Sequence, residues 1–253
     1  MRPLLLLLGC LAPVLVAQAQ PGTPTDPGVT VDLTVLLQGA YDSGSSMRTM
    51  LASGGDVPLA QPYSAAAYDG TPLGYDGSES APSLPAGTVD WILIEARTST
   101  AAADRISTVA ALLLSDGSVV DASESGLPVL SGVPVGSHYI IVRHRNHIAA
   151  MSATAVAFTN GTGALDLTAP GAAFGSNATV EVTPGVEALW AADGSGDGLV
   201  TAPDFNAYSA ASASGATGYR SEDYTMDGLV TAPDFNLYNA NAAAGAASAV
   251  PEN

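Results

Sequence analysis

Two acidic stretches near the C-terminus contain residues whose types and spacing suit calcium binding. The decapeptide DGLVTAPDFN occurs at 197–206 and again at 227–236, and each copy completes a twelve-residue loop, 193–204 and 223–234. Calcium takes about six to eight oxygen ligands, and loops of this length supply them from positions 1, 3, 5, 7, 9 and 12, with a glycine at position 6. The residues at the ligand positions are Asp193, Ser195, Asp197, Leu199 (through its carbonyl), Thr201 and Asp204 in the first loop, and Asp223, Thr225, Asp227, Leu229 (likewise), Thr231 and Asp234 in the second. Because both loops repeat the same residue types at the same spacing, we predict that the chain binds two calcium ions.

Each loop leads into a predicted helix that has to position it. In both copies the threonine at position 9 is a suitable N-cap, and the aspartate three residues later completes a Thr-x-x-Asp capping box. A proline lies between this threonine and this aspartate, in the first turn of the helix, where a missing N–H costs no hydrogen bond. Phe205 and Tyr208, and likewise Phe235 and Tyr238, fall three residues apart on one helical face. We expect these rings to pack the two helices against each other.

The part of the chain before the loops has the pattern of short strands. Apolar and β-branched residues recur at 29–37, 88–97, 109–114, 119–121, 138–144, 148–158, 164–168 and 179–182. Asp116-Gly117 is a strong signal for a two-residue hairpin turn. Only 46–52 looks helical, and 61–85, rich in Gly, Pro, Ser and Tyr, is expected to be a long surface loop. The pattern predicts a mainly β fold, an antiparallel β-sandwich (Ig-like or jelly-roll-like) followed by a small α-helical calcium module.

The first residues have the organisation of a secretory signal peptide. Arg2 precedes an apolar run at 4–16 and a small-x-small cleavage site at 17–19. No later stretch approaches the roughly 20 apolar residues of a membrane span, and the only cysteine, Cys10, lies in the apolar run. We therefore expect a secreted or cell-surface protein without disulfides. The expected organisation is a signal peptide at 1–19, a linker at 20–28, a sandwich domain at 29–186, a calcium module at 187–245 with a flexible connector at 209–218, and a tail of small residues, with the last unit at 246–253.

The charge excludes two classes of partner. The chain has 24 acidic and 7 basic residues, a formal net charge of −17. Nucleic acids and anionic membranes both require a basic surface, so neither is an expected partner. From Glu187 onward nine acidic residues face a single basic residue, Arg220, and two calcium ions would neutralise half of that excess.

The loops with their helices, from about Leu189 to Ala243, resemble a type I dockerin, the paired calcium-loop module of bacterial polysaccharide-degrading complexes. The resemblance depends on loop starts thirty residues apart, a helix after each loop, no helix before the first loop, and aspartate rather than glutamate at position 12. It implies two calcium ions and a cohesin-like or cell-surface protein as partner. The upstream stretches VDWILIEAR, ALLLSDGSVVD and YIIVRHRNHIAAMSA resemble a module placed before such repeats in secreted and surface proteins of Bacteroidetes-type bacteria. That second resemblance implies secretion and a β-rich fold, and no particular activity.

Two positions depart from the dockerin pattern. Position 3, usually Asn or Asp, is Ser195 or Thr225, so each loop has three carboxylates and we expect affinities of about 10⁻⁶ to 10⁻³ M. Positions 10 and 11, where the family contacts its partner, are usually hydroxylated. Here they are Ala202, Pro203, Ala232 and Pro233. This departure argues against an ordinary cohesin as the partner, while the identity of the two copies preserves a pseudo-twofold symmetry.

A second polar cluster lies in the predicted strand region and contains Arg143, His144, Arg145 and His147, with His138 upstream. One interpretation is a transition-metal or anion site, since His-x-x-His can converge on one ion. The other is a strand end and turn whose arginines pair with acids such as Glu95 or Asp90. On one strand the last two histidines would point to opposite faces, and no nearby Glu or Asp is expected to supply a third ligand. The second interpretation is therefore favoured.

The remaining candidates concern sugars and catalysis. Tyr63, Tyr68 and Tyr75, in the predicted long loop, could stack on sugar rings of a polysaccharide. No pair of carboxylates is marked as a glycosidase centre, and no nucleophile, zinc or phosphate motif is present. The sequence favours a secreted, non-catalytic protein for attachment or assembly, at the cell surface or in a polysaccharide-degrading system. Two alternatives stay open: a carbohydrate-binding protein stabilised by the calcium repeat, and a dockerin-bearing glycoside hydrolase.

Overall fold

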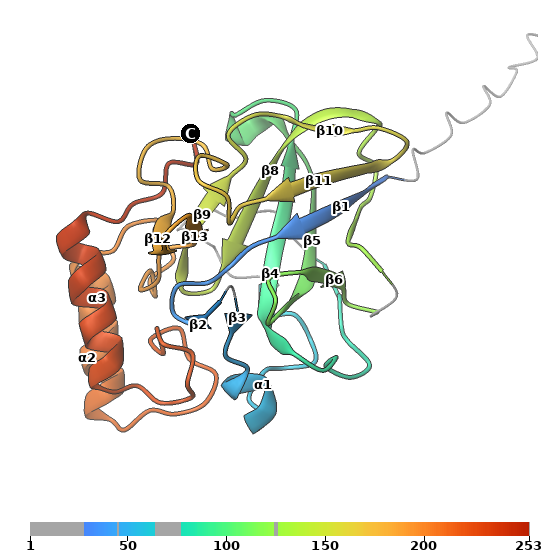
Figure 1. The fold of residues 1–253 in the computed structure, drawn as a ribbon. Coiled ribbons are helices and arrows are strands. Elements are labelled where there is room, and N and C mark those ends of the chain that lie inside the picture. Colours follow the sequence, from blue (N-terminus) through green and yellow to red (C-terminus); the bar gives the residue numbers. More distant parts are fainter. Residues whose placement is uncertain (1–27, 45, 64–76, 124–125, 253) are drawn as a thin grey trace, which may run out of the picture.

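The described chain is mainly β, with antiparallel sheets and few helices, as predicted. The computed structural model describes residues 28–44, 46–63, 77–123 and 126–252 (Figure 1). Its elements are β1 (Val29–Thr34), β2 (Tyr41–Ser43), β3 (Ser46–Met47), α1 (Met50–Gly54), β4 (Thr88–Arg97), β5 (Arg105–Leu114), β6 (Val119–Asp121), β7 (Val129–Leu130), β8 (Gly136–His144), β9 (His147–Met151), β10 (Val156–Phe158), β11 (Thr162–Asp166), β12 (Val180–Thr183), β13 (Val186–Ala188), α2 (Ala202–Ala213) and α3 (Ala232–Ala244), with a 3₁₀ turn at Ala102–Asp104. We call residues 29–188 the β region and residues 189–252 the repeat region.

Two larger sheets organise the β region. A six-stranded sheet has the order β10-β8-β4-β5-β6, with β9 pairing β8, and a three-stranded sheet has the order β11-β1-β7. The pairing of β1 with β11 is parallel, which departs from a purely antiparallel arrangement. The hairpin between β5 and β6 turns at Asp116-Gly117 as predicted, and Gly117 adopts a φ of +87°, a conformation that favours glycine.

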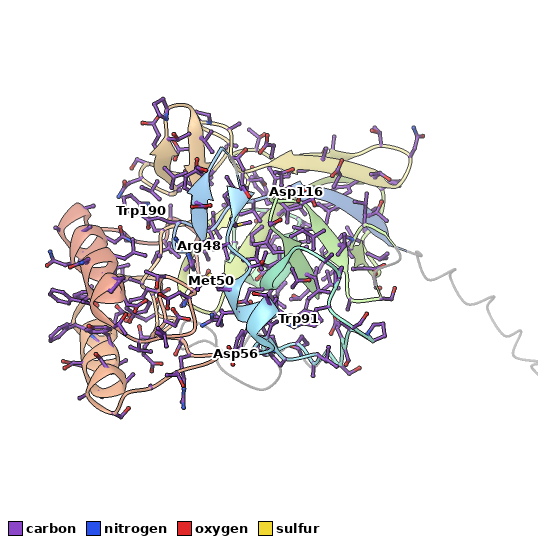
Figure 2. The ribbon with its side chains drawn as sticks, turned by 60° about the horizontal axis from the view of Figure 1, so that its bottom comes forward. Arg48, Met50, Asp56, Trp91, Asp116 and Trp190 are labelled. Atoms are coloured by element: carbon purple, nitrogen blue, oxygen red, sulfur yellow. The ribbon has the colours of Figure 1, made fainter. Side chains whose placement is uncertain are left out.

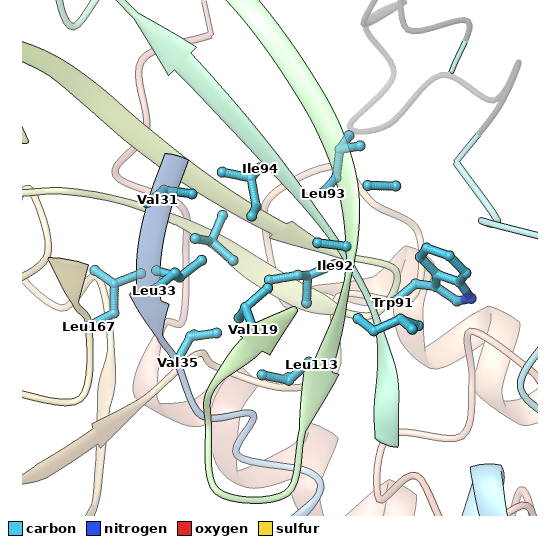
Figure 3. Packing of buried hydrophobic residues seen from close by; sticks show 14 of the residues in the cluster. Val31, Leu33, Val35, Trp91, Ile92, Leu93, Ile94, Leu113, Val119 and Leu167 are labelled. Atoms are coloured by element: carbon cyan, nitrogen blue, oxygen red, sulfur yellow. The ribbon is translucent and has the colours of Figure 1, made fainter. Parts of the chain in front are cut away.

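The main core lies between these two sheets. The residues of β1 alternate between buried and partly exposed, so one face of the strand is apolar. Figure 3 shows Val31 and Leu33 of β1 opposite Ile92 and Ile94 of β4. All ten residues of β4 are buried. Both faces of that central strand are therefore covered.

Several predicted boundaries need correction. The segment 148–158, predicted as one strand, is divided into β9 and β10, and Ser152 between them is buried with its hydroxyl accepting the Ile140 N–H at 3.1 Å. The helix predicted at 46–52 begins only at Met50, after β3. The signal peptide at 1–19 lies outside the described residues, as does the linker except for Gly28.

The repeat region contributes two long helices, α2 and α3, which lie side by side at one edge of the molecule (Figure 1). The predicted flexible connector at 209–218 is half helical, because α2 continues to Ala213. The expectation that the last residues form only a tail is also wrong. Helix α3 extends to Ala244, and Ala246 and Val250 beyond it are buried.

The repeat region packs closely against the β region. The expected boundary at 186/187 falls inside β13, and Leu189, just after it, belongs to the main core. A second apolar cluster joins Ile148 of β9 to Trp190, Val200 and Tyr224 of the repeat region. Figure 2 labels Trp190 beside the helices and Arg48 between them and α1. No helix among the described residues is long and apolar enough to cross a membrane.

Candidate functional site

The first aspartate of each predicted calcium loop organises the turn around it. Asp193 accepts the N–H groups of Asp197 and Gly198 at 3.1 and 3.0 Å. Asp223 accepts the corresponding N–H groups, of Asp227 and Gly228, at 3.1 and 2.8 Å. The glycine at position 6 has a φ of +79° in the first loop and +85° in the second, so this position favours glycine in both. The two loops therefore share these hydrogen bonds and this backbone conformation as well as their sequence.

The last aspartate of each loop joins the loop to its helix. Asp204 accepts the N–H of Ser195 at 2.9 Å with one oxygen and that of Thr201 at 2.8 Å with the other. Asp234 accepts the same pair in the second copy, from Thr225 and Thr231, both at 2.8 Å. The bond to the threonine is the backward half of a capping box, which confirms the predicted helix starts at Thr201 and Thr231.

The loops are electrostatically crowded. Burial and the nearby carboxylates of Asp204 and Asp197 raise the pKa of Asp193 to about 7. Burial raises the pKa of Asp223 to about 6, with Asp234 adding to the shift and Arg145 opposing it. A carboxylate whose pKa rises in this way is disfavoured in its charged form unless a counter-charge is present.

The donor set fits a hard divalent cation, although the side chains do not by themselves form a closed cage. Among the described residues, no three or more His, Cys, Asp or Glu side chains are gathered so as to hold a metal ion. The aspartate oxygens instead accept backbone N–H bonds, and in the second loop Asp234 Oδ1 also accepts the Thr225 hydroxyl at 2.9 Å. Three carboxylates, hydroxyls at positions 3 and 9 and a carbonyl at position 7 are oxygen donors of the kind calcium prefers.

The two copies also pair with each other in a reciprocal manner. The chain after α2 pairs with the second loop, where Ala216 accepts the N–H of Val230 at 3.2 Å. The chain after α3 pairs with the first loop, where Ala246 accepts the N–H of Val200 at 3.0 Å. Isolated bridges between Thr217 and Leu229 and between Leu199 and Ala247 complete the exchange. The repeat region is thus a closed unit with pseudo-twofold symmetry.

The predicted partner-binding residues lie on an exposed surface. Ala202, Pro203, Ala232 and Pro233 are all exposed at the starts of α2 and α3. Phe205 and Phe235, two residues further on, lie 6.1 Å apart between ring centroids and remain 38% and 37% exposed. Each also contacts the tyrosine of the other helix, at 5.8 Å for Phe205–Tyr238 and 6.0 Å for Tyr208–Phe235. The rings pack the helices together as predicted and leave an aromatic face in contact with solvent.

The histidine and arginine cluster forms a strand end and a turn, as the favoured interpretation predicts. His144 ends β8 and His147 begins β9, and the two residues are cross-strand partners. The prediction that they point to opposite faces is therefore wrong, since their Nδ1 atoms lie 3.0 Å apart. The expectation that no acid lies nearby is also wrong, because Asp90 of β4 lies 3.1 Å from His144 Nε2.

A consistent order of protons links these groups. The Gly39 N–H donates to His147 Nε2 at 3.1 Å, so the proton of this ring is on Nδ1. That proton faces His144 Nδ1, at 3.0 Å, and Asn146 Oδ1, at 2.8 Å. His144 therefore carries its own proton on Nε2 and donates it to Asp90. Each ring nitrogen of His144 and His147 has a partner, so the two rings form a hydrogen-bond chain from Gly39 to Asp90.

Asp90 is the anionic centre of this chain. Burial alone would raise its pKa, but Arg145, His144 and Tyr219 outweigh burial and hold the pKa of Asp90 at about 2. Arg145 Nε donates to Asp90 at 2.9 Å, and its guanidinium lies 4.3 Å from the centre of the Tyr219 ring. The predicted pairing of the arginines with Asp90 and Glu95 is confirmed: Arg143 Nε lies 3.2 Å from Glu95.

The prediction that tyrosines of the long loop stack on sugar rings finds no support at the one position that the structure describes. Tyr63 is 5% exposed and donates its hydroxyl to the Trp91 carbonyl at 2.7 Å, so the prediction of an exposed stacking ring is wrong there. Tyr68 and Tyr75 lie outside the described residues.

Sequence reasoning missed the residues that hold the repeat region against the β region. No local pattern marks Tyr219, Gln38 or Asn241, and nothing nearby in sequence indicates the contact of Asn146 with Asp223. The bond from Gln38 Nε2 to Asn241 Oδ1, 3.2 Å long, spans 203 positions. Comparison with protein-family models, with curated proteins and with solved structures finds no match for this chain.

Proposed function

We propose that this chain is a secreted, non-catalytic calcium-binding protein in which a β-sandwich carries a dockerin-like module for attachment or assembly. The observation that supports it is the repetition of geometry: five carboxylate hydrogen bonds recur in both loops at matching positions with nearly equal lengths. The two facing sheets are compatible with the sandwich. When bound, calcium would neutralise the crowded carboxylates and link each loop to the start of its helix.

Calcium binding should be visible as two sites that separate by mutation. We expect calorimetric titration of the full chain to show two sites with Kd of about 10⁻⁶ to 10⁻³ M. Asp197→Ala should remove the first site and Asp227→Ala the second, because each removes a ligand and the acceptor of the Leu199 or Leu229 N–H. Free calcium at about 100 times Kd should raise the free energy of unfolding by roughly 2.7 kcal/mol for each loop, measured with urea.

The matched control is Asp166→Ala. Asp166 makes the same kind of local turn, accepting the Thr168 N–H at 2.9 Å, but it lies outside both loops. This variant should keep both sites. An absence of heat in the wild type, together with unchanged circular dichroism after chelation, would refute calcium binding.

The exposed aromatic face is where we place the partner. An exposed pair of aromatic rings surrounded by small residues is a suitable anchor for a protein interface, where buried aromatics contribute most of the affinity. Because Ala-Pro replaces the usual hydroxylated pair, the partner is a cohesin-like or cell-surface protein that recognises an apolar rather than a hydroxyl-rich patch.

Binding should depend on both phenylalanines. We expect Phe205→Ala with Phe235→Ala to weaken calcium-dependent binding to a purified cohesin module, chosen from a panel by surface plasmon resonance, by about 30-fold or more. Ile106→Ala, at a residue that is 39% exposed on β5, is the control and should leave the affinity unchanged. If no module binds in calcium, the cohesin-like partner is wrong; if the double variant binds as well as the wild type, the assignment of this face is wrong.

A further inference from the structure

The two-residue turn between β8 and β9 connects the β region to both predicted calcium loops. Asn146, the second residue of this turn, is fully buried. Its carbonyl accepts the N–H groups of Ala192 and Asp193, at 3.0 and 3.2 Å. Its side-chain amide donates to the carbonyl of Asp223 at 2.7 Å. Asp193 and Asp223 are the first residues of the two loops, so Asn146 contacts position 1 of both.

Asn146 has little freedom to adjust. Its Oδ1 faces the Nδ1–H of His147 at 2.8 Å, which fixes the orientation of the amide and directs Nδ2 toward the second loop. His147 in turn accepts the Gly39 N–H, and His144 is held by Asp90. The turn is therefore part of a buried network in which a shift of one member would break several hydrogen bonds.

The two loops also contact each other directly through Tyr224, at position 2 of the second loop. Its hydroxyl donates to the carbonyl of Asp204, the last residue of the first loop, at 2.9 Å. The Tyr224 ring is completely buried. A Cβ at Gly39 would lie 1.9 Å from the Tyr224 carbonyl oxygen, so the β region meets the second loop backbone to backbone.

Other contacts hold the second loop in particular against the β region. Met226, at position 4, adopts a φ of +57°, which is unusual for a residue other than glycine, and buries its side chain in the main core. Arg48 donates to the Thr225 carbonyl at 3.1 Å, and Arg145 donates to the Arg220 carbonyl. Figure 2 shows Arg48 on the side of the β region that faces the repeat region. The second loop is thus partly shaped by residues outside the repeat.

We propose that Asn146 and Tyr224 are positioning residues that couple the two calcium loops to each other and to the β8–β9 hairpin. This inference rests on the proposed calcium binding. Ordering of one loop fixes the backbone of its first or last aspartate. The buried hydrogen bonds pass that constraint to the other loop. Calcium at one loop should then raise the calcium affinity of the other, and calcium should protect the hairpin from opening. Coupling between sites of this kind is typically about 5- to 150-fold.

Variants that lack one calcium site measure the coupling between the loops. In Asp227→Ala the first loop should bind calcium at least about fivefold more weakly than it does in the wild type with its second loop filled, and Asp197→Ala should show the reverse effect. In the background of Tyr224→Phe, which keeps the ring, or of Asn146→Ala, this ratio should fall by at least about threefold. Tyr139→Phe and Asn206→Ala are the matched controls and should keep the wild-type ratio.

Amide exchange gives a second measurement in the unaltered protein. We expect calcium to slow hydrogen exchange at His147–Met151 by about fivefold or more in the full chain, because the hairpin then opens only with the filled loops. Two calcium sites that bind independently in the wild type, or an exchange rate of β9 that does not respond to calcium, would overturn the coupling. An absence of any calcium binding would instead refute the proposed function on which it rests.

Discussion

Glu95→Gln is expected to lower the free energy of unfolding by about 3–5 kcal/mol, because it removes the anion from a buried cluster of arginines. Glu95 and Arg97 are both fully buried and ion-paired, and Arg143 lies 3.2 Å away from the second carboxylate oxygen. Arg105, partly exposed, is at 3.9 Å. A neutral amide would leave the guanidinium groups buried with one partner carboxylate fewer, and that uncompensated charge dominates the cost.

The cluster also fixes the end of the described chain. Glu252 lies 2.6 Å from Arg143 and 3.4 Å from Arg97, and Arg97 donates to the Pro251 carbonyl at 2.6 Å. Val250, just before, packs on Ile141, Ala149 and Met151. Residues 250–252 are thus pinned to the sheet by the same arginines that Glu95 orients. Loss of Glu95 should loosen this segment as well as the strand.

Urea unfolding with calcium held constant measures the change. The matched control is Glu181→Gln, at an exposed residue whose carboxylate accepts the Gly185 N–H at 2.9 Å, a bond that glutamine can keep. It should change stability by no more than about 0.5 kcal/mol. A cost below about 1 kcal/mol for Glu95→Gln would mean that water or Glu252 compensates the arginines and that the cluster contributes little.

The features that could be predicted from sequence are those with local causes. The Thr-x-x-Asp boxes, the glycines at position 6 and the Asp116-Gly117 turn each act within a few residues, and the structure has all of them. The alternation of Val29, Val31 and Leu33 likewise predicts a strand with one buried face. Such signals predict the starts of α2 and α3 and the positions of most strands.

The features that could not be predicted depend on contacts between distant residues. The pairing of His144 with His147 across a hairpin could not be predicted, because the turn between them, Arg145-Asn146, has neither residue at positive φ and so lacks the glycine signature of a tight hairpin. Asp90, which completes the cluster, lies 54 positions earlier. The docking of the repeat region on the β region could not be predicted either, because Asn146 and Asn241 are polar residues whose burial follows only from partners supplied by the fold.

Acidification should destabilise the protein through the two histidines of this hairpin. Burial lowers the pKa of His144 below its ordinary value of 6.5, with Asp90 opposing the shift and Arg145 adding to it. Burial, His144 and Arg145 lower the pKa of His147 well below 6.5. A second proton on His147 would also break its bond to Gly39, since Nε2 would no longer accept.

The direction of this pH dependence follows from the number of protons that the folded and unfolded chains bind. When the folded-state pKa is below the unfolded value, the unfolded chain binds more protons, so the stability present above pH 6.5 is lost as the pH falls toward the folded-state pKa. The slope approaches about 1.4 kcal/mol per pH unit for each histidine that stays neutral in the folded state. In calcium-free protein Asp193 and Asp223 act in the opposite sense, because their raised folded-state pKa values favour the folded state at acid pH.

The experiment must therefore isolate the histidines from the carboxylates. His147→Gln retains an acceptor and a donor but cannot titrate, and the calcium concentration is kept equal for both proteins. Subtracting the urea-derived stability of the variant from that of the wild type at each pH cancels the contribution of the loops. We expect this difference to fall by about 1.4 kcal/mol per pH unit below pH 6.5. A flat difference between pH 7.5 and 5 would show that His147 is not buried in its neutral form, and the proton order from Gly39 to Asp90 would then be wrong.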